Sequence, residues 1–124
     1  MGTEPARPER RSALTLFGTG AERRDFIAID DAVDLIVRAV DPAATPPAVL
    51  NGGSGRATSV RELATGLLAA LGARQSLHFN GEAKAGDPTT MVADMRRANA
   101  FGFKPTTSLQ QGLADYADWV RGEL

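Results

Sequence analysis

The chain has 124 residues, a length that suits one domain with one hydrophobic core. Hydrophobic residues make up 43% and charged residues 23% of the chain, and the formal net charge of −1 gives no basic field that would hold nucleic acid. The lack of cysteine excludes disulfides, thiolate nucleophiles and cysteine-zinc sites. Since the apolar runs are too short to cross a membrane, we expect a cytoplasmic protein that binds neither nucleic acid nor membrane.

The first twelve residues differ in character from the rest. Residues 1–12 hold three arginines and two prolines but no apolar stretch, which predicts a disordered lead-in rather than a signal peptide. Residues 13–124 alternate short apolar runs with amphipathic segments and show no internal repeat. This alternation predicts an α/β fold, a small mixed domain of short strands and about four amphipathic helices.

Two extended segments and a helix are expected first. Residues 14–17 form an apolar run that ends at a Gly-Thr-Gly turn, and residues 24–29 form a second extended segment. Asp30 or Asp31 is expected to cap a helix, because a carboxylate accepts from its free N–H groups. The helix is expected to end at Asp41, before a proline. Its apolar face comprises Val33, Ile36, Val37 and Val40, and Asp34 pairs with Arg38 on the other side.

The clearest helix of the chain lies between two short strands. Residues 48–51 have the composition of a brief buried strand. Ser59 and Glu62 form a capping box, and the helix that follows carries a continuous apolar stripe up to Gly72. Residues 77–79 are predicted to form the second strand.

A turn and two helices are expected in the last part of the chain. Residues 85–88 form a glycine-proline turn. Asp94 is expected to cap a short helix through Phe101, and Ser108 begins the last helix with a second capping box. The inward residues of that helix are expected to be Leu109, Leu113, Tyr116, Ala117 and Val120, with Trp119 packing against the body of the domain.

Most of the isolated motifs have an ordinary structural interpretation. Gly18-Thr19-Gly20 begins like a dinucleotide fingerprint, but Arg23 takes the place of the third glycine and no helix starts there, so a connecting turn is favoured. His78 is the single histidine and lacks the companions of a metal site. The spacing of Tyr116 marks it as a core or boundary residue rather than a catalytic acid. No metal site and no catalytic set are predicted.

Two groups of charged residues leave alternatives open. Arg23 and Arg24 follow a glycine-rich turn and suit a bidentate diphosphate clamp, or they are solvated arginines with Asp25 as a local salt-bridge partner. Lys84 and Asp87 flank a glycine turn and suit a phosphate and a ribose hydroxyl, or they are loop charges. Composition alone settles neither case.

A series of short motifs in a fixed order carries more information than any one of them. They are Phe17-Gly18-Thr19-Gly20, Arg24-Asp25-Phe26-Ile27, Asp30-Asp31-Ala32, Leu50 to Gly55, Ser59 to Leu63, Ala85 to Pro88, Val92 to Asp94, Phe101 to Pro105, Ser108 to Leu113, and Trp119. This order resembles the extended short-chain dehydrogenases/reductases of the NAD-dependent epimerase/dehydratase family, which act on nucleotide sugars. The resemblance is to their C-terminal, substrate-binding part, and it covers nearly everything from Leu14 onward.

The resemblance implies a set of substrate-binding residues. By it, the strand with Thr15 and Phe17 would offer backbone groups to the nucleotide base, Arg24 would contact the diphosphate, and Asp87 the nucleotide ribose. Lys84 stands where the family usually has arginine, so it supplies a point charge instead of a planar fork.

Other positions depart from the family pattern. Glu22 and Ala28 replace residues that are commonly Gln and Tyr or His, which implies a different choice of ligand. A complete Rossmann domain, with its glycine-rich NAD(P) motif, and the catalytic Tyr-x-x-x-Lys do not occur in the sequence; Tyr116 is followed four residues later by Val120. We therefore expect no cofactor to be bound by this chain, although NAD(P) is expected for the full-length family, and no catalysis by the chain alone.

Three functions compete on this basis. The first is the nucleotide-sugar-binding portion of an epimerase or dehydratase, completed by an NAD-binding domain or a separate NAD-binding chain. The second is a stand-alone, non-catalytic nucleotide-sugar sensor, and the third is a protein-interaction module that no longer binds nucleotide. Because short strand edges accompany an apolar helix face, we expect the isolated chain to form homo-oligomers or to need a partner.

Overall fold

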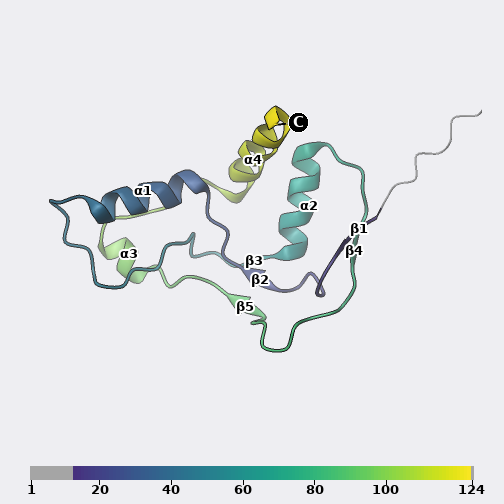
Figure 1. Cartoon of the computed structure of the whole chain (residues 1–124), viewed down its shortest axis with the longest axis horizontal. Coiled ribbons are helices and arrows are strands. Elements are labelled where there is room, and N and C mark those ends of the chain that lie inside the picture. The colour runs from purple at the N-terminus through teal and green to yellow at the C-terminus, as the bar shows by residue number, and fades with distance from the viewer. Residues whose placement is uncertain (1–12, 124) are drawn as a thin grey trace, which may run out of the picture.

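The computed structural model describes residues 13–123 as an elongated α/β unit (Figure 1). The elements in chain order are β1 (Leu14–Leu16), β2 (Arg23–Arg24), α1 (Ile29–Val40), β3 (Thr58–Ser59), α2 (Val60–Leu71), β4 (Leu77–Phe79), β5 (Thr90–Met91), α3 (Arg96–Ala100) and α4 (Leu109–Glu123). The four helices and short strands agree with the fold class expected from the sequence. Residues 1–12, expected to be a disordered lead-in, lie outside the described residues.

The strands form two small sheets. β1 pairs with β4 in parallel, with Leu14 opposite Leu77. In the second sheet β2 is central, antiparallel to β3 and parallel to β5. The second extended segment is shorter than expected, because only Arg23 and Arg24 have strand partners on both sides. This central strand carries one of the predicted site residues.

Helix α2 follows its predicted signals closely. The Ser59 hydroxyl accepts a hydrogen bond from the Glu62 N–H at 3.1 Å, and Gly72 ends the helix with a left-handed φ of 66°. α2 packs against α4, where the chain comes so close to Gly66 that a Cβ there would lie 2.8 Å from Leu113. The start of α4 is also as predicted, since the Ser108 hydroxyl accepts from the Gln111 N–H at 3.1 Å.

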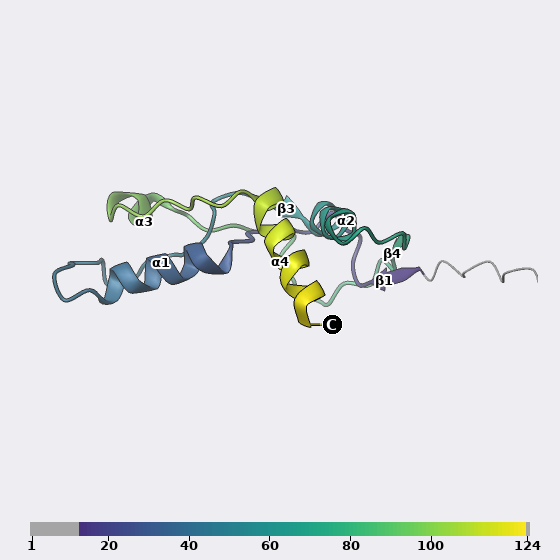
Figure 2. The ribbon, with the colours of Figure 1, turned by 90° about the horizontal axis from the view of Figure 1, so that it is seen from above.

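The small hydrophobic core lies at the opposite end of the molecule, between α1 and α3 (Figure 2). Phe103 and Ala98 are fully buried there, and Leu35 and Met95 complete the cluster. The chain enters α3 one residue later than predicted. The N-cap residue of α3 is Met95, so Asp94 lies one position before the cap. Its carboxylate nevertheless accepts a hydrogen bond from the Arg96 N–H at 3.1 Å.

The predicted cap of α1 is wrong. Ala28 occupies the cap position, and neither Asp30 nor Asp31 precedes the helix. Asp31 is buried within the first turn, and its carboxylate accepts from the N–H groups of Thr106 and Thr107 at 3.1 and 3.0 Å. The residue therefore ties α1 to the segment before α4. Burial alone raises the pKa of Asp31, but these hydrogen bonds outweigh that effect and hold the pKa below its usual value.

The apolar face of α1 is not turned inward. Val33, Ile36, Val37 and Val40 are between 47% and 72% exposed, whereas Leu35 is buried. The predicted ion pair is present, with Arg38 Nε 2.8 Å from Asp34 Oδ2, and the helix ends before Asp41 as expected. The described part of the chain contains nothing that covers the four-residue face, which is named the α1 apolar face below.

Two other burial predictions are wrong. Residues 48–51 form no strand, because no described segment pairs with them, and Val49 is 65% exposed. In α4, Ala117 is buried but Tyr116 and Trp119 are 50% and 59% exposed and contact each other, with ring centroids 5.6 Å apart. Trp119 therefore packs on Tyr116 instead of on the body of the domain.

Candidate functional site

A hollow of about 700 Å³ opens beside the central strand β2. Its walls come from the turn after β1, from β2, from the start of α2 and from the loop between β4 and β5. The lining residues are Phe17, Gly18, Glu22, Arg24, Val60, Glu82, Ala83, Lys84, Asp87, Pro88 and Thr89. Four of the five predicted site residues, Phe17, Arg24, Lys84 and Asp87, thus meet in one place.

The two arginines of β2 point to different surroundings. Successive residues of a strand lie on opposite faces, so Arg24 lines the hollow while Arg23 Nη1 reaches the Ala57 carbonyl at 3.4 Å. Arg24 Nη1 donates to the Arg23 carbonyl at 2.8 Å, which turns its guanidinium back along the strand. A clamp made by both arginines is excluded by this arrangement, and Arg24 is the one placed to contact a ligand in the hollow.

Asp25 does not pair with either arginine. Its carboxylate accepts from the N–H and hydroxyl of Ser54 at 2.8 and 2.6 Å, from the Gly55 N–H at 2.9 Å and from the Ala93 N–H at 3.2 Å. Burial raises the pKa of Asp25, but the hydrogen bonds outweigh it and the pKa lies below the ordinary value. Asp25 therefore connects its own segment to the segments that contain Ser54 and Ala93. Because Asp25 directly follows Arg24, these hydrogen bonds fix the end of the strand that carries Arg24.

Lys84 and Asp87 belong to the loop between β4 and β5. The Asp87 N–H donates to the Lys84 carbonyl at 3.1 Å, and Gly86 within this turn has a φ of 91°, a left-handed value that favours glycine. The turn brings one cation and one carboxylate to the same side of the hollow, both exposed to solvent. An ammonium group suits a phosphate there, and a carboxylate suits a sugar hydroxyl.

The remaining predicted residues lie in and next to β1. Phe17 stands at the rim of the hollow and is 75% exposed. Thr15 lies inside β1, opposite His78 of β4, and is not among the lining residues. His78 is a strand residue, as predicted.

Sequence reasoning noted Glu22 only as a departure from a family pattern, yet it is part of this wall. Its carboxylate accepts from the Thr19 N–H at 2.8 Å, the Thr19 hydroxyl at 3.1 Å and the Gly20 N–H at 2.9 Å. These hydrogen bonds, chiefly from the Thr19 backbone, hold the pKa of Glu22 below its usual value. An acidic residue two positions after a Gly-Thr-Gly turn is the sequence signal that points to such an arrangement.

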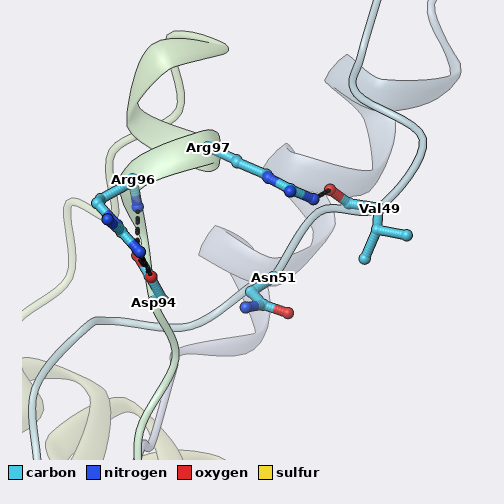
Figure 3. A pocket seen from close by; sticks show the side chains of 5 residues that line it. All are labelled: Val49, Asn51, Asp94, Arg96 and Arg97. Carbon is cyan, nitrogen blue, oxygen red and sulfur yellow. Dashed lines mark hydrogen bonds and ion pairs between the residues drawn. The ribbon is translucent and has the colours of Figure 1, made fainter.

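A second hollow, of about 420 Å³, lies near α3 and is lined by Val49, Asn51, Asp94, Arg96 and Arg97 (Figure 3). Its cations are already engaged. Arg96 Nη2 lies 2.6 Å from Asp94 Oδ2, and Arg97 Nη1 donates to the Val49 carbonyl at 3.3 Å. The hydrogen bonds from Arg96 lower the pKa of Asp94 to about 2. Asp94 thus neutralises Arg96, and none of the site residues predicted from the sequence lines this second hollow.

The described residues also bear on metal binding and on membrane insertion. Within residues 13–123 no group of three histidine or acidic side chains is arranged to hold a metal ion. In the same part of the chain, the helices are too short or too polar to cross a membrane.

Solved nucleotide-sugar epimerases share this fold. The chain superimposes on UDP-glucose 4-epimerase from Thermotoga maritima with UDP-glucose at a TM-score of 0.81, with 27% identity, over 92% of this chain and 36% of that one. For MoeE5 in complex with UDP-glucuronic acid and NAD the TM-score is 0.80 and the identity 32%, over 94% of this chain and 39% of that one. The fold is therefore that of a segment of these proteins.

Sequence comparison leads to the same class. The profile of the NAD dependent epimerase/dehydratase family matches residues 6–53. The dTDP-L-rhamnose 4-epimerase of Burkholderia thailandensis is 31% identical over 92% of this chain and 31% of its own length, and the UDP-glucose 4-epimerase of Mycolicibacterium smegmatis is 35% identical over 87% and 34%. The chain belongs to the NAD dependent epimerase/dehydratase family. It spans about a third of the length of the curated relatives that it matches.

Proposed function

We propose that this chain is the C-terminal, nucleotide-sugar-binding portion of an NAD-dependent epimerase or dehydratase, and that the hollow beside β2 holds the nucleotide. The observation that carries this proposal is the convergence of Phe17, Arg24, Lys84 and Asp87. These residues come from three separate segments of the chain, and the family resemblance assigns all of them to one ligand. Their meeting in one hollow supports a shared ligand.

The chemistry of the hollow suits a nucleoside diphosphate. Arg24 offers a planar guanidinium and Lys84 a mobile ammonium, so together they oppose the charge of a diphosphate. Asp87 accepts from ribose hydroxyl groups. The base is then bound at the rim by backbone groups of Phe17 and of the adjoining strand β1, which contains Thr15. The charged side chains of the hollow orient the ligand, and no catalytic group is assigned here.

The redox chemistry would then take place outside this chain. An NAD-binding portion, in the same protein or as a separate chain, would bind NAD(P) and supply hydride transfer, while residues 13–123 hold the substrate. MoeE5, of which this chain covers 39%, is a structure with both UDP-glucuronic acid and NAD. The exposed α1 apolar face favours such a completed assembly over a stand-alone sensor, because apolar faces of this kind mark contacts with other protein surfaces.

Adjacent arginines provide a matched test. In calorimetric titrations of the chain with UDP, TDP, GDP and NAD, we expect one nucleoside diphosphate to bind and NAD to give no heat. Arg24→Ala should weaken that binding about tenfold or more, because a charge-assisted contact to phosphate is lost. Arg23→Ala removes the same charge from the opposite face of β2 and should change affinity about twofold or less.

The outcomes separate the candidate functions. Equal effects of the two substitutions would contradict the assigned site, since only general electrostatics would then be at work. Binding of a nucleoside diphosphate that ignores Arg24→Ala would place the site elsewhere. Failure of all four ligands to bind would contradict the proposal and favour the protein-interaction module.

A further inference from the structure

The acidic side chain of Glu22 lies in the hollow that is proposed to bind a diphosphate, where a negative charge is unfavourable. Glu22 lines this hollow together with Arg24. Glu22 directly precedes β2 and Arg24 is its last residue, so the two lie two positions apart and on the same face. A free carboxylate there would repel phosphate and lower affinity. Glu22 is not free, however, because its two oxygens accept three hydrogen bonds from Thr19 and Gly20.

The turn that Glu22 holds has an unusual backbone. Gly18 and Gly20 both have a φ of 84°, in the left-handed region, with Thr19 between them. The Glu22 carboxylate lies against this turn so closely that a Cβ on Gly18 would be 2.6 Å from Glu22 Oε1. The N–H groups of Thr19 and Gly20 point at one carboxylate, so the turn forms a receptor for an anion that the chain supplies itself.

The same turn connects three walls of the hollow. The Gly18 N–H donates to the Glu82 carbonyl at 2.9 Å, and the Gly81 N–H donates to the Gly18 carbonyl at 2.8 Å, which ties the turn to the loop that carries Lys84. The backbone N–H of Arg61, in α2, donates to the Gly20 carbonyl of the same turn at 3.0 Å. A displacement of the turn would therefore move the loop of Lys84 relative to Arg24.

We infer that Glu22 is a positioning residue for nucleotide binding: its carboxylate holds the Gly18–Gly20 turn and thereby sets the distance between the Lys84 loop and Arg24. This inference rests on the proposed function of the hollow. The negative charge of Glu22 is compensated by the N–H and hydroxyl donors of the turn, so the net effect of Glu22 on diphosphate binding is favourable. A carboxylate that acted only through its charge would have the opposite effect.

Glu82 is the matched control for this sign. It lines the same hollow, and within residues 13–123 its contacts to the turn are made by its backbone and not by its side chain. Glu82→Ala removes a negative charge without loosening the turn, so UDP affinity should rise by about twofold at low salt and return to the wild-type value in 0.5 M NaCl.

Glu22→Ala should act in the opposite direction. We expect it to weaken UDP binding about tenfold, and equally at low salt and in 0.5 M NaCl, because a lost geometry is not screened. Glu22→Gln keeps one acceptor oxygen for the turn and should recover part of the affinity. If Glu22→Ala strengthens UDP binding as Glu82→Ala does, or leaves it unchanged, the inference is wrong while the proposed function stands.

Amide exchange tests the same inference without a nucleotide. In Glu22→Ala the N–H groups of Gly18 and Gly81 should lose protection about tenfold, whereas Glu82→Ala should leave them protected. Equal exchange in the two variants would overturn the positioning role even if the wild-type chain bound no nucleoside diphosphate. If the wild-type chain bound none of UDP, TDP and GDP while the exchange difference was present, the proposed function alone would be contradicted.

Discussion

The two ends of this molecule differ in how far their side chains are satisfied within the chain. At the end with the hollow, Glu22 and Asp25 find all their donors within the chain, and α2 is closed by Ser59 at its start and Gly72 at its end. At the other end, α1 buries Leu35 but leaves four large apolar side chains in solvent. The carboxylates of Glu22 and Asp25 are thus satisfied inside the chain, whereas part of the apolar surface of α1 is not covered.

This difference indicates which part of the chain is complete by itself. A polar network needs specific partners at hydrogen-bond distance, so its closure within residues 13–123 means that the geometry of the hollow is set locally. Apolar burial needs only area, and area can be supplied by any neighbouring polypeptide. We therefore expect nucleotide binding to be a property of this chain, and full stability to depend on what covers α1.

A substitution in the hydrophobic core at the α1 end should reduce stability more than any other proposed here. Phe103 is fully buried against Ala98, Leu35 and Met95, so Phe103→Ala should lower the free energy of unfolding by about 3–5 kcal/mol. The control is Phe17→Ala, which removes the same side chain from a site where it is 75% exposed and should change stability by about 0.5 kcal/mol or less. Urea denaturation measures both. Similar losses would mean that the α1 end has no core of its own.

The second effect tests the polar network through pH. The pKa of Asp25 is lowered in the folded chain, so its contribution is present above the unfolded value near 3.8 and is lost as pH falls through the folded value. Asp25→Asn should cost about 1–3 kcal/mol at neutral pH, because an amide cannot accept all four hydrogen bonds. It should also flatten the loss of stability that occurs as pH falls from about 5 through the lowered pKa of Asp25 in the folded chain.

Asp30→Asn is the control for that measurement. Asp30 lies exposed in the first turn of α1 and contributes only through the helix dipole, so its substitution should cost about 0.3–1 kcal/mol. Acid unfolding followed by circular dichroism compares the two variants. If Asp25→Asn keeps the wild-type pH profile, the network behind Arg24 does not hold the hollow end together.

The features that local sequence predicts best are those whose partners lie within a few residues. The capping interactions of Ser59 and Ser108 and the pair Asp34–Arg38 span three or four positions, and the structure confirms each of them. The convergence of the site residues was expected only from the family resemblance. Nothing in the spacing of Arg24 and Lys84 shows that their segments meet.

The predictions that failed depend on distant parts of the chain or on a neighbour. Asp31 looked like a cap, but its donors lie 75 and 76 residues further on, where no local pattern reaches. The periodicity of α1 shows which side chains share a face and cannot show what covers that face. Residues 48–51 have the composition of a strand, yet a strand exists only where a partner strand is present.

The role of the α1 apolar face can be tested by a single substitution in it. Val37 is 59% exposed on the α1 apolar face, and full burial of a valine contributes about 1.5–3 kcal/mol, so covering its exposed part contributes about 1 kcal/mol. Val37→Ser changes helix propensity little and should therefore weaken self-association about fivefold per chain. Sedimentation equilibrium of the isolated chain measures this change.

Asp34→Asn separates this apolar effect from a general change in the helix. It breaks the exposed pair with Arg38 on the other side of α1, costs about 0.3–0.5 kcal/mol of stability, and should leave the association constant unchanged. Equal weakening by both substitutions would show that association follows the stability of α1 and not its apolar face. A wild-type chain that stays monomeric at high concentration would show that this face is covered by a different polypeptide or by none, because the contact between copies would then be too weak to form.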